Sequence, residues 1–232
     1  MRILIGYSMR SGSTLLQHIL DGHSALDAYG DLSSIPAFWR CRADRMSRRH
    51  VCIKPMDVLY LQQRLDFYRH FDRLVWLARD PRDSYLSTIE SGYAYLLWPR
   101  GELRDGIDLG LLRRWQRIYR HYFEHPDRWY LVRYEDLVSQ PVTTVSALLD
   151  HLGLSRETLF PFPRFKRHHG GDYKITEHQH VTANSRARYL REMSPAQVEV
   201  FDELLGDSIR ALGYASDQAQ VGLAYETRRA RR

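Results

Sequence analysis

Short apolar runs alternate with amphipathic segments along the first 135 residues of the chain. The runs are rich in Val, Ile, Leu and aromatic residues, which is typical of buried parallel strands. They lie at residues 2–7, 50–55, 73–79 and 128–134. The pattern predicts a strand in each range, and the alternation with helical segments indicates an α/β fold with a parallel sheet.

The segments between and after these runs repeat apolar residues at helical spacing, as in residues 13–22, where Leu15, Leu16 and Ile19 share one side. Pro81 stands where the first turn of a helix tolerates proline, and Ser194 is a suitable cap for the last helix. The predicted helices cover residues 13–22, 57–71, 81–96, 109–125, 141–154 and 194–214.

The length of 232 residues and the apolar content of 44% suit one sizeable core, so we expect a single domain over residues 1–214. Residues 156–186 have no period of either kind and are rich in Pro, Gly, His and aromatic residues. A loop of this length is usually a functional lid or a disordered segment, and we expect a lid over the substrate. Residues 215–232 read as a basic C-terminal tail.

The net charge of +6 favours an anionic partner, but charge alone does not choose among a nucleotide, an acidic lipid and a nucleic acid. Cys41 and Cys52 are too few for a disulfide framework and lack metal-ligand spacing with histidines, so we expect a reducing compartment and no metal site. The sequence shows no leader and no apolar run of membrane length. It therefore predicts a soluble cytoplasmic protein.

The stretch GYSMRSGSTLLQHILDGH (6–23) runs from a strand through a Gly/Ser loop into a helix. Such a junction aims backbone N–H groups and the positive end of the helix dipole at an anion, which predicts a phosphate-binding loop. A nucleoside triphosphatase loop would carry lysine where Ser13 stands. Arg10 is the available cation, and its planar fork suits phosphate or sulfate oxygens. A strand-to-helix turn without a ligand is the alternative.

A second stretch, LVWLARDPRDSYLST (74–88), repeats this arrangement. Arg79 ends a predicted strand, and Ser87 lies in the helix that follows. Because carboxyl ends of parallel strands converge on one crevice, we expect Arg79 and Ser87 to hold a second phosphate of the same nucleotide. The alternative is a surface ion pair of Arg79 with Asp80 or Asp83.

Together the two stretches resemble the sulfotransferases that use 3′-phosphoadenosine-5′-phosphosulfate (PAPS). MRSGSTLLQHILDGH (9–23) is similar to their 5′-phosphosulfate loop, in the style of the tyrosylprotein and carbohydrate branches, and ARDPRDSYLS (78–87) to their 3′-phosphate motif. The resemblance continues in family order through YGDLSSIP, CIKP, VRYEDLVSQPVTTVSALLDHLGL and HVTANSRARY. It implies a three-layer P-loop-like α/β fold, with a central parallel sheet flanked by helices. It also implies in-line transfer of a sulfuryl group from PAPS to an acceptor hydroxyl, with adenosine 3′,5′-bisphosphate released and no metal required.

The resemblance assigns donor-binding roles by position. It gives the 5′-phosphosulfate to Arg10, Ser11, Gly12, Ser13 and Thr14. It gives the 3′-phosphate to Arg79 and Ser87, with further help from Arg82, Arg186 or Arg188, because Ser91 stands where a basic residue is expected. Tyr134 corresponds to a tyrosine near the adenine or the 3′-phosphate, or else is a core-edge aromatic residue beside a helix cap formed by Glu135 and Asp136.

The catalytic residues implied by the resemblance are Arg10, Lys54 and a general base. Lys54 is one of only three lysines in the chain and matches a lysine that contacts the leaving phosphate; a solvated strand-edge lysine is the alternative. Asp31 is the first candidate for the base. The alternative is that Asp31 is a loop aspartate that caps the next helix. His180, with its neighbour His178, is the other candidate base.

Two other functions are alternatives to a sulfotransferase on the sequence alone. A kinase of a small metabolite would share the strand, loop and helix, but it would require lysine after Gly12 and a magnesium-binding carboxylate. A basic module that binds anions would cluster arginines and aromatic residues on one face, whereas here the basic residues are spread along the chain. The acceptor (carbohydrate, lipid, secondary metabolite or tyrosine) and the oligomeric state are not specified by the sequence.

Overall fold

The computed structural model describes residues 1–45, 50–62, 66–92, 100–159, 181 and 183–214. The chain divides into two compact units. The first comprises Met1–Ala78 and Ile118–Ala183, and the second Arg79–Arg117 and Asn184–Arg232. Most of the expected lid, with His178 and His180, and the whole expected basic tail lie outside the described residues.

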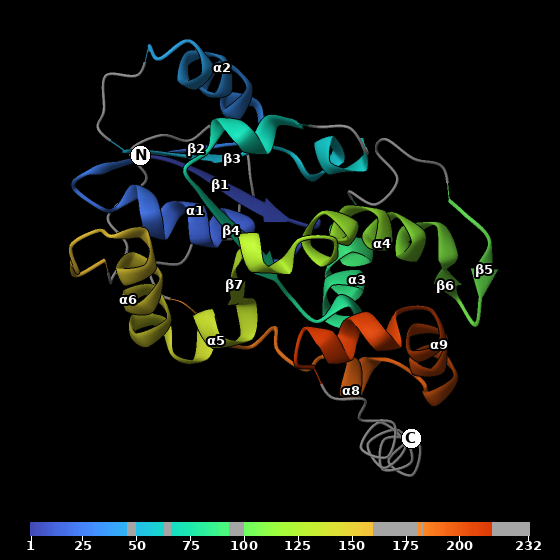
Figure 1. The fold of residues 1–232 in the computed structure, drawn as a ribbon. Coiled ribbons are helices and arrows are strands. Elements are labelled where there is room, and N and C mark those ends of the chain that lie inside the picture. The colour runs from blue at the N-terminus through green and yellow to red at the C-terminus, as the bar shows by residue number, and fades with distance from the viewer. Residues whose placement is uncertain (46–49, 63–65, 93–99, 160–180, 182, 215–232) are drawn as a thin grey trace. The chain divides into compact units, whose positions relative to one another are not determined.

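A five-stranded parallel sheet in the order β2-β3-β1-β4-β7 forms the centre of the first unit (Figure 1). Its strands are β1 (Arg2–Tyr7), β2 (Leu26–Gly30), β3 (His50–Lys54), β4 (Arg73–Ala78) and β7 (Tyr130–Arg133). Each of the four predicted ranges contains one of these strands. Tyr7 pairs with Leu77, and Gly30 with Lys54, so the carboxyl ends of neighbouring strands lie at the same edge of the sheet.

Side chains on one face of this sheet pack against α1 (Ser13–Asp21), α5 (Tyr134–Ser139) and α6 (Pro141–Leu152) in a shared core. Alternate residues of β1 enter that core, because successive strand side chains point to opposite faces. Trp76, from β4, lies instead among the aromatic rings of Tyr60, Tyr119 and Trp129. Figure 1 shows α2 (Asp31–Arg42) across the sheet from α1. The predicted α/β fold, with a central parallel sheet flanked by helices, is confirmed.

Two elements of the first unit were not predicted, and one prediction was wrong. The hydrophobic pattern of the sequence did not predict β2 or α2. The helix predicted over residues 57–71 is replaced by two 3₁₀ helices, Asp57–Leu61 and Asp66–His70. Gln62 adopts an extended backbone (φ −85°, ψ 114°) directly after the first of them. Tyr60 is fully buried there and donates a hydrogen bond from its hydroxyl to the carbonyl of Ile5 (2.9 Å), so tertiary packing overrides the local helical period.

The second unit contains α3 (Pro81–Glu90), α8 (Tyr189–Glu192), α9 (Pro195–Ala211) and a small antiparallel ribbon of β5 (Leu103–Arg104) and β6 (Ile107–Asp108). Helix α4 (Leu109–Phe123) begins in this unit and ends in the first; a 3₁₀ turn over Pro126–Arg128 follows it. Tyr85 of α3 meets Phe201 of α9 edge to face at 5.5 Å between ring centroids. Ser194 caps α9 in a reciprocal capping box with Gln197, as the sequence predicted.

Candidate functional site

The segment Ser8–Gly12 joins β1 to α1 in an unusual backbone conformation. Arg10 (φ 60°) and Gly12 (φ 87°) both lie in the left-handed region. The hydroxyl of Ser11 donates to the carbonyl of Ser8 at 2.8 Å, so this side chain holds the loop itself. A Cβ atom at Gly12 would lie only 2.4 Å from the ring of Tyr134. Glycine is therefore required here both by conformation and by the close approach of an aromatic ring.

The N-terminus of α1 has no side-chain cap in the described part of the chain. Its N-cap, Gly12, makes no side-chain capping bond, and no acidic residue lies in the first turn. The first amides of a helix have no acceptor within the helix. The N–H groups of Ser13 and Thr14, together with the helix dipole, thus form a site suited to an anion. Ser13 also shares a side-chain hydrogen bond with Tyr7, whose pKa is raised well above its usual value, chiefly by burial.

Asp57, in the segment after β3, anchors this loop by a hydrogen bond. This residue was not predicted from the sequence. Its Oδ2 accepts a hydrogen bond from the backbone N–H of Met9 at 2.8 Å, and the side chain is buried. The bond joins two segments 48 residues apart, which fixes the start of the loop relative to β3. No motif or spacing in the sequence signals such a contact.

Lys54 and Asp31 are brought together by the register of the sheet. Because Gly30 pairs with Lys54, the residue that follows β2 reaches the end of β3, and Lys54 Nζ lies 2.9 Å from Asp31 Oδ1. Lys54 is only 1% exposed, so it is not a solvated strand-edge lysine. Burial lowers the pKa of its ammonium group, and the negative charges of Asp31 and Asp57 oppose this shift. Its ammonium also lies 5.2 Å from the centre of the Tyr7 ring.

Asp31 is the first residue of α2 and has a left-handed backbone (φ 46°). Its side chain does not cap that helix; the N-cap is Gly30, and the Asp31 carboxylate pairs with Lys54 instead. The carboxylate is 20% exposed, so it is within reach of a second molecule. A Cβ atom at Gly30 would lie 2.0 Å from Gln17 Oε1 and 2.9 Å from Lys54 Cε. Gln17, also missed from the sequence, thus packs against the turn that carries Asp31.

Tyr134 begins α5, and its buried ring belongs to the core next to Gly12. The ring supports the loop from the core, and the expected contact of Tyr134 with the adenine or the 3′-phosphate stays a prediction. Glu135 and Asp136 lie in the first turn of α5 and are not its caps. Asp136 accepts a hydrogen bond from Arg133 Nε at 2.8 Å.

In the second unit, the start of α3 differs from the start of α1. Asp80 is the N-cap of α3, and its carboxylate accepts from the backbone N–H of Arg82 at 2.9 Å. The same carboxylate binds the Arg82 guanidinium through Nε (2.9 Å) and Nη2 (2.6 Å). The expectation that this junction repeats the first one is therefore wrong for the helix end, because a carboxylate already occupies it.

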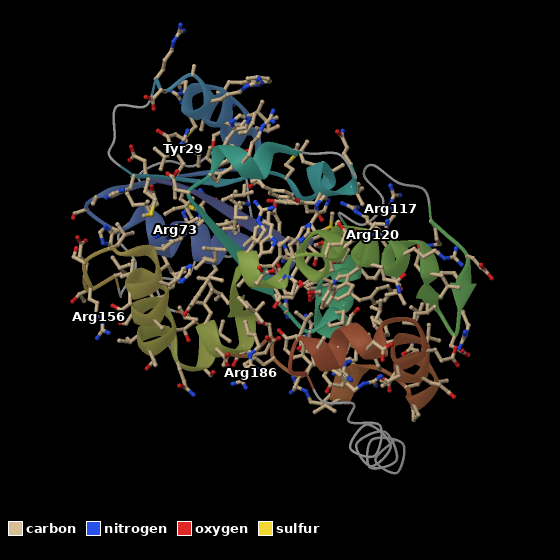
Figure 2. All side chains as sticks on the ribbon, in the orientation of Figure 1. Tyr29, Arg73, Arg117, Arg120, Arg156 and Arg186 are labelled. Carbon is tan, nitrogen blue, oxygen red and sulfur yellow. The ribbon has the colours of Figure 1, made fainter. Side chains whose placement is uncertain are left out.

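The arginines near this junction have different surroundings. Arg79 is buried, which excludes an exposed surface pair, and its Nη2 donates to the carbonyl of Ser185 at 2.6 Å. Arg82 is fully buried, with its guanidinium 3.8 Å from the centre of the Tyr189 ring. Arg188 pairs with Glu90 (3.0 Å) and Glu192 (2.9 Å). Both Arg82 and Arg188 thus have carboxylate partners. Arg186 is exposed (Figure 2). Ser87 is buried in α3.

Two features of the described residues bear on the kind of site. Within them, no group of three or more His, Cys, Asp or Glu side chains is arranged to hold a metal ion. None of the helices they form has the length and apolarity that a membrane crossing needs. Cys41 and Cys52 are free and buried.

Comparisons with known proteins agree with this architecture. The model of the "Sulfotransferase family" matches residues 72–158. The chain is 29% identical over 153 residues to the omega-hydroxy-beta-dihydromenaquinone-9 sulfotransferases Stf3 of Mycobacterium bovis and Mycobacterium tuberculosis. These matches cover 61% of this chain but only 35% of the relatives, so the chain aligns with about a third of their length.

Solved structures share the fold at low sequence identity. The sulfotransferase domain from the curacin biosynthetic pathway has a TM-score of 0.63 at 17% identity, with coverage of 92% of this chain and 97% of the domain. The sulfotransferase domain of the Synechococcus PCC 7002 olefin synthase has the same score and identity, with 97% and 94% coverage. Mouse sulfotransferase SULT7A1, solved in complex with PAP, has a TM-score of 0.63 at 15% identity, with 95% and 87% coverage. The chain is thus similar to the sulfotransferase family over residues 72–158, and it shares its fold with solved sulfotransferases.

Proposed function

We propose that this protein transfers the sulfuryl group of PAPS to the hydroxyl of an acceptor and releases adenosine 3′,5′-bisphosphate. The observation that carries the proposal is the ion pair of buried Lys54 with the partly exposed Asp31, in the same unit as the uncapped N-terminus of α1. A cation, a carboxylate and an anion site are the three groups that in-line sulfuryl transfer requires. The match to the sulfotransferase family supports the same reaction class.

In this mechanism the 5′-phosphosulfate binds the amides of Ser13 and Thr14 and the guanidinium of Arg10. The acceptor oxygen attacks sulfur while the bond from sulfur to the bridging phosphate oxygen breaks. Lys54 stabilises the negative charge that develops on the leaving phosphate. The electron pair of the broken bond stays on the bisphosphate.

Asp31 is the base in this proposal. In the structure its carboxylate pairs with Lys54 at 2.9 Å. A phosphosulfate competes with Asp31 for that ammonium group, and the carboxylate that is released accepts the proton of the acceptor hydroxyl. His180 is the alternative base and lies outside the described residues.

The 3′-phosphate is assigned to Arg79, Ser87 and Arg186, and this assignment rests on the sequence resemblance. Arg82 and Arg188 are left out of it because each already pairs with a carboxylate. Tyr134 contributes by supporting Gly12 from the core. The names of the two mycobacterial relatives specify a hydroxylated acceptor, which is consistent with an alcohol as the acceptor here. The free, buried cysteines suit the cytoplasmic location that we expect.

Isothermal titration calorimetry with adenosine 3′,5′-bisphosphate, followed by a sulfate-transfer assay with labelled PAPS, tests the proposal. We expect the bisphosphate to bind without a divalent cation and to bind more tightly than ATP with magnesium. Arg79→Ala should weaken binding by about tenfold or more, because a charge-assisted bond to phosphate is lost. Binding of ATP with magnesium but not of the bisphosphate would instead indicate a kinase and contradict the proposal.

A further inference from the structure

The outward face of α2 is apolar, which is unusual for a helix that already buries its other face. Leu32 is 67% exposed, Ile35 41% and Trp39 55%. They are spaced by three and four residues and so form one stripe. Ala37 and Cys41 of the same helix are buried on the inner side. In the described part of the chain six large apolar side chains are exposed, and three of them are in this stripe.

The stripe starts beside the proposed base. Asp31 immediately precedes Leu32, so the stripe begins at the residue next to the proposed base, whose carboxylate is 20% exposed. From Leu32 to Trp39 the helix rises by roughly 10 Å. An alcohol whose hydroxyl lies at Asp31 therefore has an apolar surface of this length along which a hydrocarbon chain can lie.

The two serine hydroxyls in the first turn of α2 are bonded to backbone carbonyls at the start of the helix. The hydroxyl of Ser33 donates to the carbonyl of Gly30 at 2.7 Å, and that of Ser34 to the carbonyl of Asp31 at 2.5 Å. A sugar acceptor would require hydrogen-bond partners along the helix, because its many hydroxyls must stay satisfied when they leave water. The first turn thus favours an apolar acceptor over a carbohydrate.

The far end of the stripe is fixed by aromatic contacts. Trp39 meets Phe38 edge to face at 5.5 Å, and Phe38 stacks on Phe71 at 6.0 Å. The guanidinium of Arg42 lies 5.4 Å from the Trp39 ring, and that of Arg40 lies 5.8 Å from the ring of Tyr29, which is labelled in Figure 2. Trp39 thus contacts both the Phe38 ring and the Arg42 guanidinium while 55% of it stays exposed.

We infer that the acceptor is a lipid alcohol with a long hydrocarbon chain, which lies along Leu32, Ile35 and Trp39 with its hydroxyl at Asp31. This inference rests on the proposed function, and it names the class of acceptor. The chain is bound by burial of apolar surface, so affinity rises with its length.

The test compares sulfation of decanol and of butanol by the whole protein with PAPS as donor. We expect kcat/KM to be at least about tenfold higher for decanol. Trp39→Ser should lower kcat/KM for decanol by about tenfold and that for butanol much less, because a four-carbon chain at Asp31 ends before Trp39; bisphosphate affinity should stay the same. Val142→Ser is the matched control, because Val142 of α6 is exposed to a similar extent (65%) and should change none of these quantities.

Three results would overturn the inference while the proposed function stands. These are equal kcat/KM for the two alcohols, loss of both activities alike in Trp39→Ser, and no sulfation of decanol by a protein that binds the bisphosphate and sulfates another acceptor. A change in oligomeric mass on Leu32→Ser, measured by analytical ultracentrifugation, would mean that a second copy of the chain covers α2, and it would also overturn the inference. Failure of the proposed function looks different, because then neither bisphosphate binding nor transfer to any acceptor is found.

Discussion

The two strand-to-helix junctions that look alike in the sequence are built differently. After β1, a Gly/Ser loop leads into α1 with no side-chain cap and no acidic first-turn residue in the described structure. After β4, Asp80 caps α3 and also binds Arg82. At the first junction the backbone N–H groups of the helix start are left for a ligand. At the second, the Asp80 carboxylate already accepts a hydrogen bond from one of these N–H groups.

This difference separates two ways of binding a phosphate. An anion at α1 gains the helix dipole and several amides at once. At α3 the carboxylate of Asp80 would repel an anion at the helix end, so a phosphate there has to rely on side chains such as Arg79 and Ser87.

Asp80→Ala should destabilise the protein by about 4 kcal/mol, because it leaves the buried Arg82 guanidinium without its carboxylate and removes the α3 cap. Urea unfolding followed by circular dichroism measures the effect. Asp80→Asn is the control: it keeps a capping oxygen and should lose less. Equal stability of the wild type and Asp80→Ala would show that the α3 junction is not held by this carboxylate.

Lys54→Ala should lower kcat by about a hundredfold or more, because a charge aimed at the leaving phosphate is lost. The affinity for the bisphosphate, measured by calorimetry, should change much less than kcat. Lys54→Arg keeps the charge and should retain part of the activity. A parallel loss of kcat and of bisphosphate affinity would assign Lys54 to the fold rather than to the transfer step.

Gly12→Ala should destabilise the protein more than Gly92→Ala does. Both glycines have a positive φ (87° and 71°), so each substitution carries the left-handed penalty of about 1 to 2 kcal/mol. Only at Gly12 does the new Cβ also collide with the Tyr134 ring, whereas at Gly92 nothing lies within 4 Å. Thermal unfolding compares the stability of the two variants. A lower unfolding temperature for Gly92→Ala than for Gly12→Ala would contradict the role given to the contact between Gly12 and Tyr134.

The pH dependence of kcat/KM for PAPS should show the lowered pKa of Lys54. As the pH rises, Lys54 loses its proton and the site loses a positive charge, so activity falls. Since burial lowers this pKa, the fall should begin below the pH of an ordinary lysine, about 10.4. In Lys54→Arg the guanidinium stays charged, and this alkaline limb should disappear. The same limb in both proteins would assign it to another group.

Much of the fold was predictable because β1, β3, β4 and β7 are rich in Val, Ile, Leu and aromatic residues. Strand β2, with the sequence LDAYG, has poor strand propensity and is held by its pairing with β3. Helix α2 was missed because apolar residues occupy both of its faces, which hides the helical period, and because Pro36 lies inside it.

The candidate site was predictable only in part. The Gly/Ser loop and Lys54 stand out by residue type, but the brace from Asp57 to Met9 depends on a contact that no local pattern reveals. The Asp80 cap did leave a signal, since an aspartate before a proline is a common helix start. The same aspartate also lies in the stretch that resembles a 3′-phosphate motif, where the charge of Arg79 is the stronger signal.

The central claim is that the open N-terminus of α1 binds the 5′ end of the nucleotide. Backbone amide chemical shifts of the labelled protein, recorded with and without adenosine 3′,5′-bisphosphate, test it most directly. We expect large changes at Ser13 and Thr14 and a smaller change at Arg82, whose amide is bonded to Asp80. Saturating bisphosphate with no change at Ser13 and Thr14 would contradict it.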